Sequence, residues 1–370
     1  METINSAINL FKRYPILIFP LFITWIIMAT GVIYFKWHFP WDNYSSSEQL
    51  VYGYFFFLTI SFSLIFSNSI LVELIEQDEY GFKMSLSKAV YDSFFKNIWQ
   101  IIKLALLWSL TWYFLVLLKV MFSKKKNNGT QEESAENIAK TLAGADSLSW
   151  STFTIDMLIK ALRMAMFIMI PAFAWEKKGF VDSFKRGISI VGYRTTNFIE
   201  GFIITLGVQF ILYLPPSIMF FISNKTKIQF NDISWYLCIV YIGFAWSFTL
   251  YVEQLFGTEL FLWQKKYENQ CEIANENNMP LPEFSSIPKP FLLDEINDLE
   301  TIEKTRIKKE TKKNKEVHKP KTRIEKMRLN FENKSEDELR NIIENKNKYQ
   351  KFAVEIAESI LKNKTLGNTV

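Results

Sequence analysis

The chain has 370 residues, of which 49% are hydrophobic and 22% are charged, and its formal net charge is +5 at pH 7. These averages conceal a division, because long apolar runs fill the sequence up to about residue 265 and polar residues dominate beyond it. A composition divided in this way excludes a single soluble domain and indicates a membrane domain followed by a soluble tail.

Six apolar windows are long enough to cross a bilayer as helices. A hydrocarbon core of about 30 Å needs roughly 20 apolar residues. The sequence therefore predicts an all-α fold, a polytopic membrane bundle of six spans within residues 1–264. The predicted spans cover about residues 14–35, 50–75, 101–122, 153–175, 198–222 and 233–263.

Lysine and arginine gather on one side of these spans. Cytoplasmic loops of membrane proteins carry an excess of Lys and Arg, so we expect both termini to lie in the cytoplasm. A lysine run at 124–126 opposes this orientation, but the basic residues of the other short loops outnumber it. The residues that favour it are Lys12, Arg13, Lys83, Lys88, Lys96, Lys177, Lys178, Lys185, Arg186, Arg194, Lys265 and Lys266.

Two segments that follow apolar runs are similar to each other. Residues 79–88 and 177–186 each turn at a glycine, Gly81 or Gly179, and continue as an amphipathic stretch with basic residues. The N-terminal residues 4–14 form a shorter copy. This pattern is typical of helices that lie in the membrane interface. We predict three parallel repeats, each an interfacial helix followed by a two-span hairpin; the alternative is that any helix entering a membrane from a basic side has this pattern.

The residues also resemble a known family. The opening segment INLFKRYPILIFP at residues 8–20, and Pro171 followed by EKKGFVDSFKR at residues 176–186, resemble a bacterial family of six-span integral membrane proteins of unknown function. The resemblance covers about residues 1–264. It implies an inner (plasma) membrane location and an all-helical fold, and it implies no activity and no site residue.

Three ionisable residues lie in the fourth predicted span. Asp156, Lys160 and Arg163 are separated by four and three positions, which places them on one helical face. Ionisable side chains in hydrocarbon are costly and are candidates for function. Two interpretations follow. Either the face lines a cavity or substrate path, or Asp156 forms a local ion pair while Arg163 extends outward to the interface or bonds a neighbouring helix.

Two carboxylates lie near the inner ends of spans two and six. Glu73 and Glu259 occur in similar contexts, VELI and TELF, and they are candidates for repeat-related positions that meet at the mouth of the bundle. The alternative is that each extends to the interface or pairs with a lysine. Further polar residues within the spans are predicted to form hydrogen bonds between helices: Asn68, Glu200, Gln209 and Glu253.

Enzyme signatures are absent from the sequence. It contains no P-loop, no H-E-x-x-H motif and no G-x-S-x-G motif. Two cysteines and two histidines are too few to favour a metal site. The sequence therefore predicts a protein that is not an enzyme and that uses no cofactor and no metal.

The tail divides into three parts. A proline-containing linker covers residues 265–292, a charged basic helix or tether covers 293–334, and a C-terminal α-hairpin covers 335–364. The hairpin opens with a capping box from Ser335 to Glu338, and it is similar to a short helical element at the ends of bacterial proteins. Basic residues predicted to contact lipid are Lys304, Arg306, Lys308, Lys309, Lys312, Lys313 and Lys315.

Three hypotheses for function follow from these patterns. The first is a non-enzymatic inner-membrane protein that acts through anionic lipid headgroups or partner membrane proteins. The second is a transporter or channel that uses the face of Asp156, Lys160 and Arg163. The third is an insertase-like factor whose basic tail contacts a ribosome or other nucleic acid. A polar, water-accessible groove between hairpins favours the second and third, and a dry bundle favours the first.

Overall fold

A computed structural model describes residues 2–79, 81–122, 133–144, 150–225, 230–290 and 323–367. Within these ranges the chain is helical and contains no β-strand, apart from one isolated bridge. The helices are α1 (Glu2–Arg13), α2 (Phe19–Ile33), α3 (Ser46–Glu79), α4 (Leu86–Phe122), α5 (Ala135–Leu142), α6 (Trp150–Trp175), α7 (Phe180–Tyr193), α8 (Thr195–Lys225), α9 (Asp232–Glu276), α11 (Arg323–Glu332), α12 (Glu336–Glu344) and α13 (Lys351–Gly367).

Six of these helices are long and apolar enough to cross a membrane, so the chain is a multi-pass membrane protein. They are α2, α3, α4, α6, α8 and α9. The prediction of an all-α protein with six spans is confirmed. Helix α9 is longer than a bilayer requires, because its 45 residues extend about 68 Å at 1.5 Å per residue.

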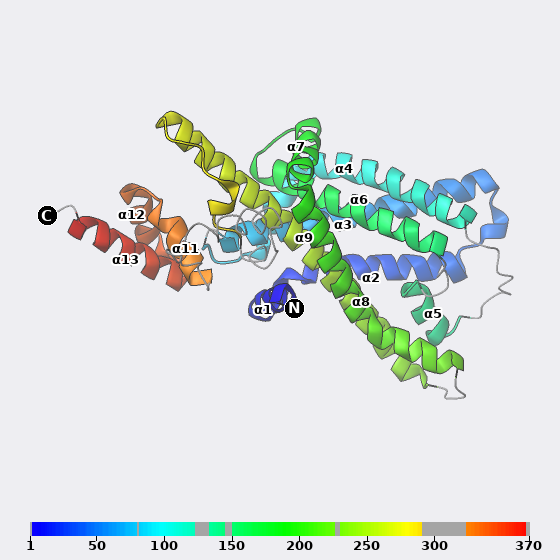
Figure 1. Ribbon diagram of the computed structural model, residues 1–370. Helices are drawn as coiled ribbons and strands as arrows, with labels where there is room; N and C mark the ends of the chain where they lie inside the picture. Colours follow the sequence, from blue (N-terminus) through cyan, green and yellow to red (C-terminus); the bar gives the residue numbers. More distant parts are fainter. Residues whose placement is uncertain are drawn as a thin grey trace, which may run out of the picture.

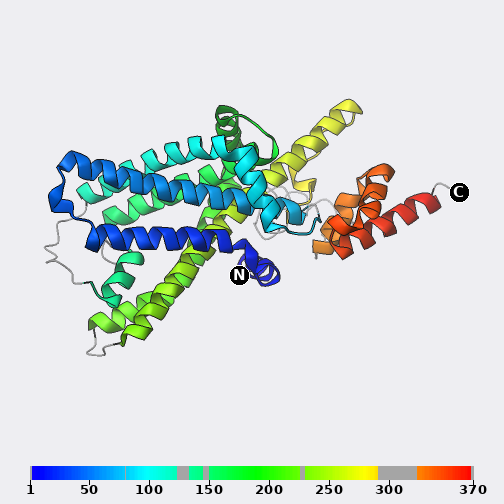
Figure 2. The ribbon, with the colours of Figure 1, turned by 180° about the vertical axis from the view of Figure 1, so that it is seen from behind.

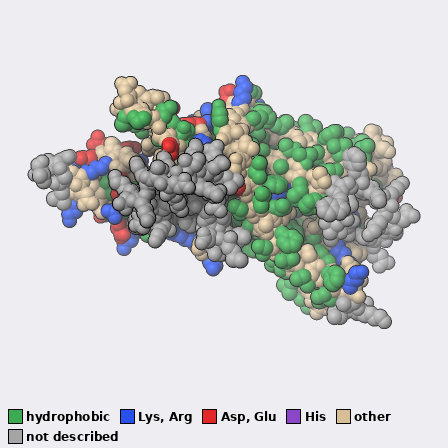
Figure 3. Space-filling model, in the orientation of Figure 1, with side chains coloured by type: hydrophobic (Ala, Val, Ile, Leu, Met, Phe, Trp, Pro, Cys, Tyr) green, Lys and Arg blue, Asp and Glu red, His purple; other side chains and the backbone are tan. Residues whose placement is uncertain are grey.

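The spans form a bundle with two distinct ends. Helices α2, α3, α4 and α6 run alongside one another, and α8 and α9 cross them obliquely (Figures 1 and 2). We call the end where α3 turns into α4 the Gly81 end, and the opposite end, where α5 lies, the α5 end. Hydrophobic side chains cover most of the visible bundle surface, whereas charged side chains gather toward the Gly81 end and the C-terminal helices (Figure 3). That division suits a bundle with lipid around its middle.

Helix α9 is the central helix of the bundle. Every residue from Ser247 to Gln264 is buried, because α2, α3, α6 and α8 all pack against it. The approach of α8 depends on Gly201, where an added Cβ would lie 2.1 Å from the ring of Phe256. A helix buried on all sides in a membrane protein has no lipid-facing surface, so polar residues along it face other helices.

At the α5 end, a short helix fills the space beside the α8–α9 hairpin. Helix α5 begins at Ser134, whose side chain accepts a hydrogen bond from the backbone N–H of Asn137. Its residues Ala135 and Ala139 are buried in one cluster with Trp235 of α9. The segment between spans α4 and α6 thus contains a packed helix.

The C-terminal unit, residues 323–367, has a hydrophobic core of its own. Helices α11 and α12 both pack on α13. The predicted capping box is present, since the Ser335 and Glu338 side chains each bond the other residue's backbone N–H. A third helix, α11, joins the predicted hairpin. The buried core residues are Met327, Phe331, Leu339, Ile342, Ala353, Ile356, Ala357 and Ile360.

The C-terminal unit is docked on the turn between α3 and α4 through backbone hydrogen bonds. The backbone N–H of Gln350 donates to Gly81 O at 2.8 Å, and the backbone N–H of Lys83 donates to Lys348 O at 3.1 Å. The rings of Phe82 and Tyr349 stack with centroids 4.6 Å apart. Residues 81–83 and 348–350 therefore form a short antiparallel contact between opposite parts of the sequence.

Three local features differ from the sequence-based expectation. Helix α9 runs on to Glu276, into the segment assigned to the linker. The predicted interfacial stretch after Gly81 is the first part of α4 itself and not a separate helix. Gly81 has a φ of 75°, but Gly179 has a φ of −61° and the left-handed residue of the second turn is Lys177, with a φ of 51°. Gly81 thus supplies a left-handed backbone conformation, whereas Gly179 does not.

Candidate functional site

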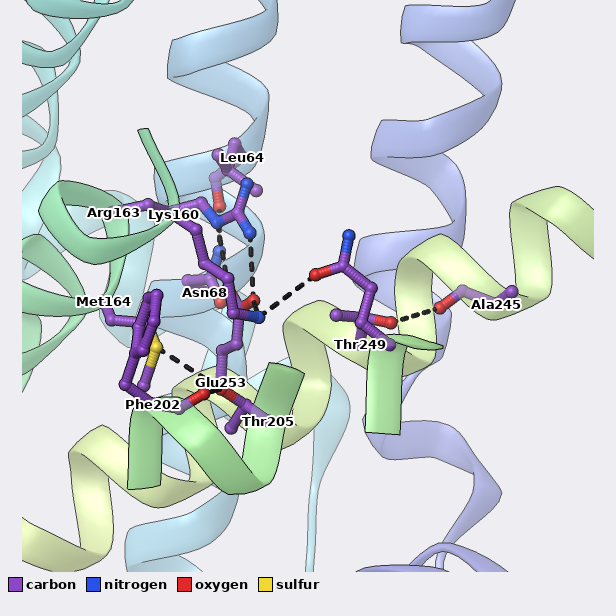
Figure 4. A network of polar contacts seen from close by, with 11 residues as sticks. Leu64, Asn68, Lys160, Arg163, Met164, Phe202, Thr205, Ala245, Thr249 and Glu253 are labelled. Carbon is purple, nitrogen blue, oxygen red and sulfur yellow. Dashed lines mark hydrogen bonds and ion pairs between the residues drawn. The ribbon is translucent and has the colours of Figure 1, made fainter. Parts of the chain in front are cut away.

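Near the middle of the bundle, two cations from α6 share one carboxylate from α9. The guanidinium of Arg163 binds Glu253 in a bidentate fashion, Nε to Oε2 at 2.9 Å and Nη2 to Oε1 at 2.9 Å. The Lys160 ammonium also donates to Glu253 Oε1. Figure 4 shows both cationic side chains directed toward Glu253. We call Lys160, Arg163 and Glu253 the ion triad.

The triad follows from helix geometry and packing. Lys160 and Arg163 are three positions apart on α6, so they lie on the same face. That face packs on α9, where Glu253 belongs to the segment buried on all sides. Glu253 is 0% exposed and the Lys160 side chain is 3% exposed. Burying these charges is tolerable because each is paired and hydrogen-bonded, and removing one partner of a buried pair costs about 3–5 kcal/mol.

Helix α8 also contributes a side chain that contacts the triad. Gln209 Oε1 accepts a second hydrogen bond from Lys160 Nζ at 3.2 Å. The triad therefore joins α6, α8 and α9, and it can act either as a structural pin or as a charged binding site.

Asp156 does not belong to the triad. The prediction that it neutralises Lys160 or Arg163 is wrong, because both oxygens of Asp156 accept from Lys119 Nζ of α4, at 2.8 and 2.9 Å. The Asp156 side chain is 45% exposed. The partners come from neighbouring helices, α4 for Asp156 and α9 for Lys160 and Arg163, and spacing along one helix does not reveal them.

Three of the four residues predicted to bond between helices divide into two kinds, and the prediction for Glu200 stays a prediction. Glu253 and Gln209 do so, as the triad contacts show. Asn68 instead donates to Leu64 O of its own helix at 2.7 Å. In the sequence, Glu253 is recognisable only as a carboxylate in the middle of a span. The packing of α6 on α9 identifies its partners.

The two carboxylates near the inner ends of their spans are both buried. Glu73 accepts a hydrogen bond from Asn97 Nδ2 at 3.4 Å. Glu259 lies in the segment of α9 that is buried on all sides. That the two meet as repeat-related positions stays a prediction.

A second ionic cluster lies at the Gly81 end and joins α7 to α9. Arg186 binds both carboxylate oxygens of Glu268 and also contacts Glu176 Oε1 at 3.4 Å. The hydrogen bonds to Glu268 raise the pKa of Arg186 above its ordinary value. Since the guanidinium is charged throughout the physiological range, this cluster is a permanent link and not a titrating group.

The seven basic residues from Lys304 to Lys315 lie outside the described residues. In the part of the chain that the structure describes, no group of three or more His, Cys, Asp or Glu side chains is arranged to hold a metal ion.

No protein-family model matches the chain, and comparison with curated proteins and with solved structures finds no match.

Proposed function

We propose that the chain is a non-enzymatic inner-membrane protein with both termini in the cytoplasm, and that it holds a basic segment against anionic lipid headgroups. One observation carries the proposal. The basic segment comprises the seven residues from Lys304 to Lys315. The described residues that precede it, up to 290, and those that follow it, from 323 on, both contact the Gly81 end of the bundle.

On the N-terminal side, the anchor is the stretch after α9. Trp263 Nε1 of α9 donates to Ile287 O at 3.3 Å, and Ile287 is 5% exposed within the bundle's hydrophobic core. Phe284 packs on the Trp263 ring with centroids 4.0 Å apart. The chain therefore returns to the bundle just before the basic segment starts.

On the C-terminal side, the anchor is the docked C-terminal unit. Besides the backbone pairing at Gly81, the Gln350 side chain donates to Asp78 Oδ1 at 3.3 Å and accepts from Tyr14 Oη at 3.2 Å. The Arg13 guanidinium lies 5.1 Å from the centroid of Phe352. The unit is thus held by groups from the N-terminus and from the turn after α3.

The charge of this end favours an anionic lipid as the partner. Each basic residue close to an anionic surface contributes about 1 kcal/mol to binding. Seven lysines and arginines fall between Lys304 and Lys315. Exposed basic residues at the Gly81 end add to them: Lys12, Arg13, Lys83, Lys88, Lys96, Lys177 and Lys185.

The same proposal includes the three repeats. We propose that α1–α2–α3, α4–α6 and α7–α8–α9 are corresponding units, each entering the membrane from the basic side and returning to it. The amphipathic sequences before α2, at the start of α4 and in α7 support this correspondence. Under this proposal the turns of the second and third units have diverged, because the left-handed residue is Gly81 in one and Lys177 in the other.

The lipid proposal can be tested with the full chain. The protein is reconstituted in nanodiscs of phosphatidylcholine, and its binding to vesicles with and without phosphatidylglycerol is measured as salt is raised. We expect binding only to the anionic vesicles, and release at high salt because the charges are screened. Replacing the seven basic residues of 304–315 by Gln should weaken binding at least tenfold.

A matched variant separates charge from side-chain identity. Exchanging lysine and arginine for each other at the same seven positions keeps the charge and should keep the binding. Equal binding to neutral and anionic vesicles would contradict the proposal. Tighter binding to RNA than to anionic vesicles would replace it with the insertase-like hypothesis.

A further inference from the structure

The ion triad carries a surplus positive charge. Lys160 and Arg163 contribute two charges and Glu253 contributes one of opposite sign. The closest carboxylate along α6, Asp156, is already paired with Lys119. On α9 the next carboxylate is Glu259, about 9 Å further along the helix axis. An unbalanced cation within a bilayer is costly, and such residues commonly mark the path or site of a ligand.

The depth of the triad shows where such a ligand would bind. Arg163 is about 15 Å along α6 from Phe153 and about 18 Å from Trp175, at 1.5 Å per residue. The site therefore lies near the middle of the span. A ligand there must either enter from the lipid or cross the membrane.

Three hydrogen-bond donors around the triad have no partner in the described part of the chain. Arg163 uses Nε and Nη2 for Glu253, which leaves Nη1. Gln209 must present its oxygen to Lys160, because an ammonium only donates, so Nε2 of Gln209 is left as a donor. The third donor is the Tyr213 hydroxyl, one helical turn after Gln209 on the same face of α8.

These donors belong to one neighbourhood. Gln209 contacts Lys160 directly, and Tyr213 follows Gln209 by one turn on the same face of α8. Arg163 is partly exposed, with 17% of its side-chain surface accessible, whereas Glu253 is fully enclosed. Arg163 is therefore the most accessible member of the triad.

We propose that Arg163 Nη1, Gln209 Nε2 and the Tyr213 hydroxyl form a binding site for a singly charged oxyanion, a carboxylate or a phosphodiester. A planar guanidinium is well matched to two oxygens of such a group. The bound anion neutralises the surplus charge that Glu253 leaves. Its source is either an anionic lipid or a small solute, and the two sources are separated by experiment. This site is independent of the basic segment at the Gly81 end.

The test uses the full chain in detergent, with the seven basic residues of 304–315 replaced by Gln so that the tail does not contribute. Thermal stability is titrated with four probes: phosphatidylglycerol, oleate, acetate and inorganic phosphate. A diacylglycerol, which carries neither a phosphate nor a carboxylate, is the neutral lipid control. We expect saturable stabilisation by at least one anionic probe. Lipid probes alone would identify a lipid ligand, and the soluble probes would identify a solute.

Two variants leave the triad charged and so protect the test from misfolding. Arg163→Lys keeps the charge of residue 163 but removes the second guanidinium edge. Tyr213→Phe removes only a hydroxyl, and Tyr236→Phe on the exposed side of α9 is its matched control. We expect at least a tenfold loss of apparent affinity in the first two variants and none in the third.

The proposal is overturned if no anionic probe stabilises the protein saturably. It is equally overturned if diacylglycerol stabilises as well as the anionic probes, or if Arg163→Lys and Tyr213→Phe bind like the parent chain. In each of these cases the triad is a structural pin between α6 and α9.

Discussion

Glu253 accepts two hydrogen bonds from Arg163, Nε to Oε2 and Nη2 to Oε1, each 2.9 Å long, and so fixes α9 to α6 within the membrane domain. The same carboxylate also accepts from Lys160. Removal of this one group leaves two buried cations without a counter-charge, whereas removal of either cation leaves a balanced pair. The carboxylate is therefore the critical member.

The first prediction concerns Glu253→Gln. The glutamine keeps the size of the side chain but leaves Lys160 and Arg163 unpaired, so we expect a loss of about 3–5 kcal/mol of stability. The measurement is the yield of monodisperse protein and its melting temperature on size-exclusion chromatography. Combining Glu253→Gln with Lys160→Met should restore part of the loss, and a melting temperature equal to wild type in the single variant would contradict the pin role.

The second prediction concerns Asp156→Asn, which serves as the comparison for the first. Lys119 pairs with Asp156 near the α5 end, and its flexible stem can carry the ammonium to the interface when the pair is broken. We expect a loss below about 1 kcal/mol, typical of an exposed pair. If Asp156→Asn lowers the inserted yield as strongly as Glu253→Gln does, the structural assignment of the partners fails.

The third prediction concerns Gly81→Ala. Gly81 has a φ of 75°, and an added Cβ would lie 2.9 Å from Ala353 Cβ. A left-handed conformation costs alanine about 1–2 kcal/mol, and the overlap pushes the C-terminal unit away. Limited proteolysis should then cut within residues 323–367 faster than in wild type. The control is Gly192→Ala, whose Cβ meets no atom within 4 Å; equal cleavage in both variants would argue against the docked arrangement.

The fourth prediction concerns the pH dependence of α12. The backbone N–H of Ser335 donates to Glu338 and holds the pKa of this carboxyl below its ordinary value. A depressed pKa means that the stabilisation is complete above the unfolded pKa, about 4.3, and is lost as pH falls through the folded value. Hydrogen exchange of α12, corrected for intrinsic rates, should be constant from neutral pH down to about 5 and should quicken below about 4.

Two variants check the origin of that pH dependence. Glu338→Gln should remove the change below pH 4, since the glutamine does not titrate. Ser335→Ala should cost about 1 kcal/mol of helix stability at neutral pH through loss of the cap. A pH profile that is unchanged in Glu338→Gln would assign the effect to another group.

The fifth prediction concerns orientation. In a background of Cys238→Ser and Cys271→Ser, an impermeant thiol reagent should label Ser47→Cys at the α5 end of cells with an intact inner membrane. Lys351→Cys, whose native side chain is 93% exposed, should react only after the membrane is opened. Labelling of position 351 from outside would reverse the proposed topology.

Much of the membrane domain could be predicted because hydrophobicity determines the spans directly. Each span is an apolar run that must satisfy its own backbone hydrogen bonds, so α3 or α8 is recognisable without knowledge of its neighbours. The capping box at Ser335 was equally local. These features depend on residues close together in sequence.

The partners in the candidate site could not be predicted, for the converse reason. Arg163 and Glu253 are 90 positions apart, and only the packing of α6 on α9 brings them together. The pairing of Asp156 with Lys119 likewise requires the place of α4 beside α6. The docking of Gln350 on Gly81 uses backbone groups, which every residue carries. No pattern of side chains in the sequence therefore predicts it.

The contact between Gly81 and Gln350 also imposes an order of events during synthesis. The turn after α3 leaves the ribosome 269 residues before its partner does, because the two hydrogen-bonded residues are at positions 81 and 350. At about 5–20 residues per second, that interval is roughly 13–54 s. During this interval, the carbonyl of Gly81 and the amide of Lys83 depend on water or on another protein for their hydrogen bonds. The contact between residues 81–83 and 348–350 forms only after the chain has been translated as far as its last helices. A prematurely terminated chain therefore differs from the full chain in that the turn after α3 lacks this contact.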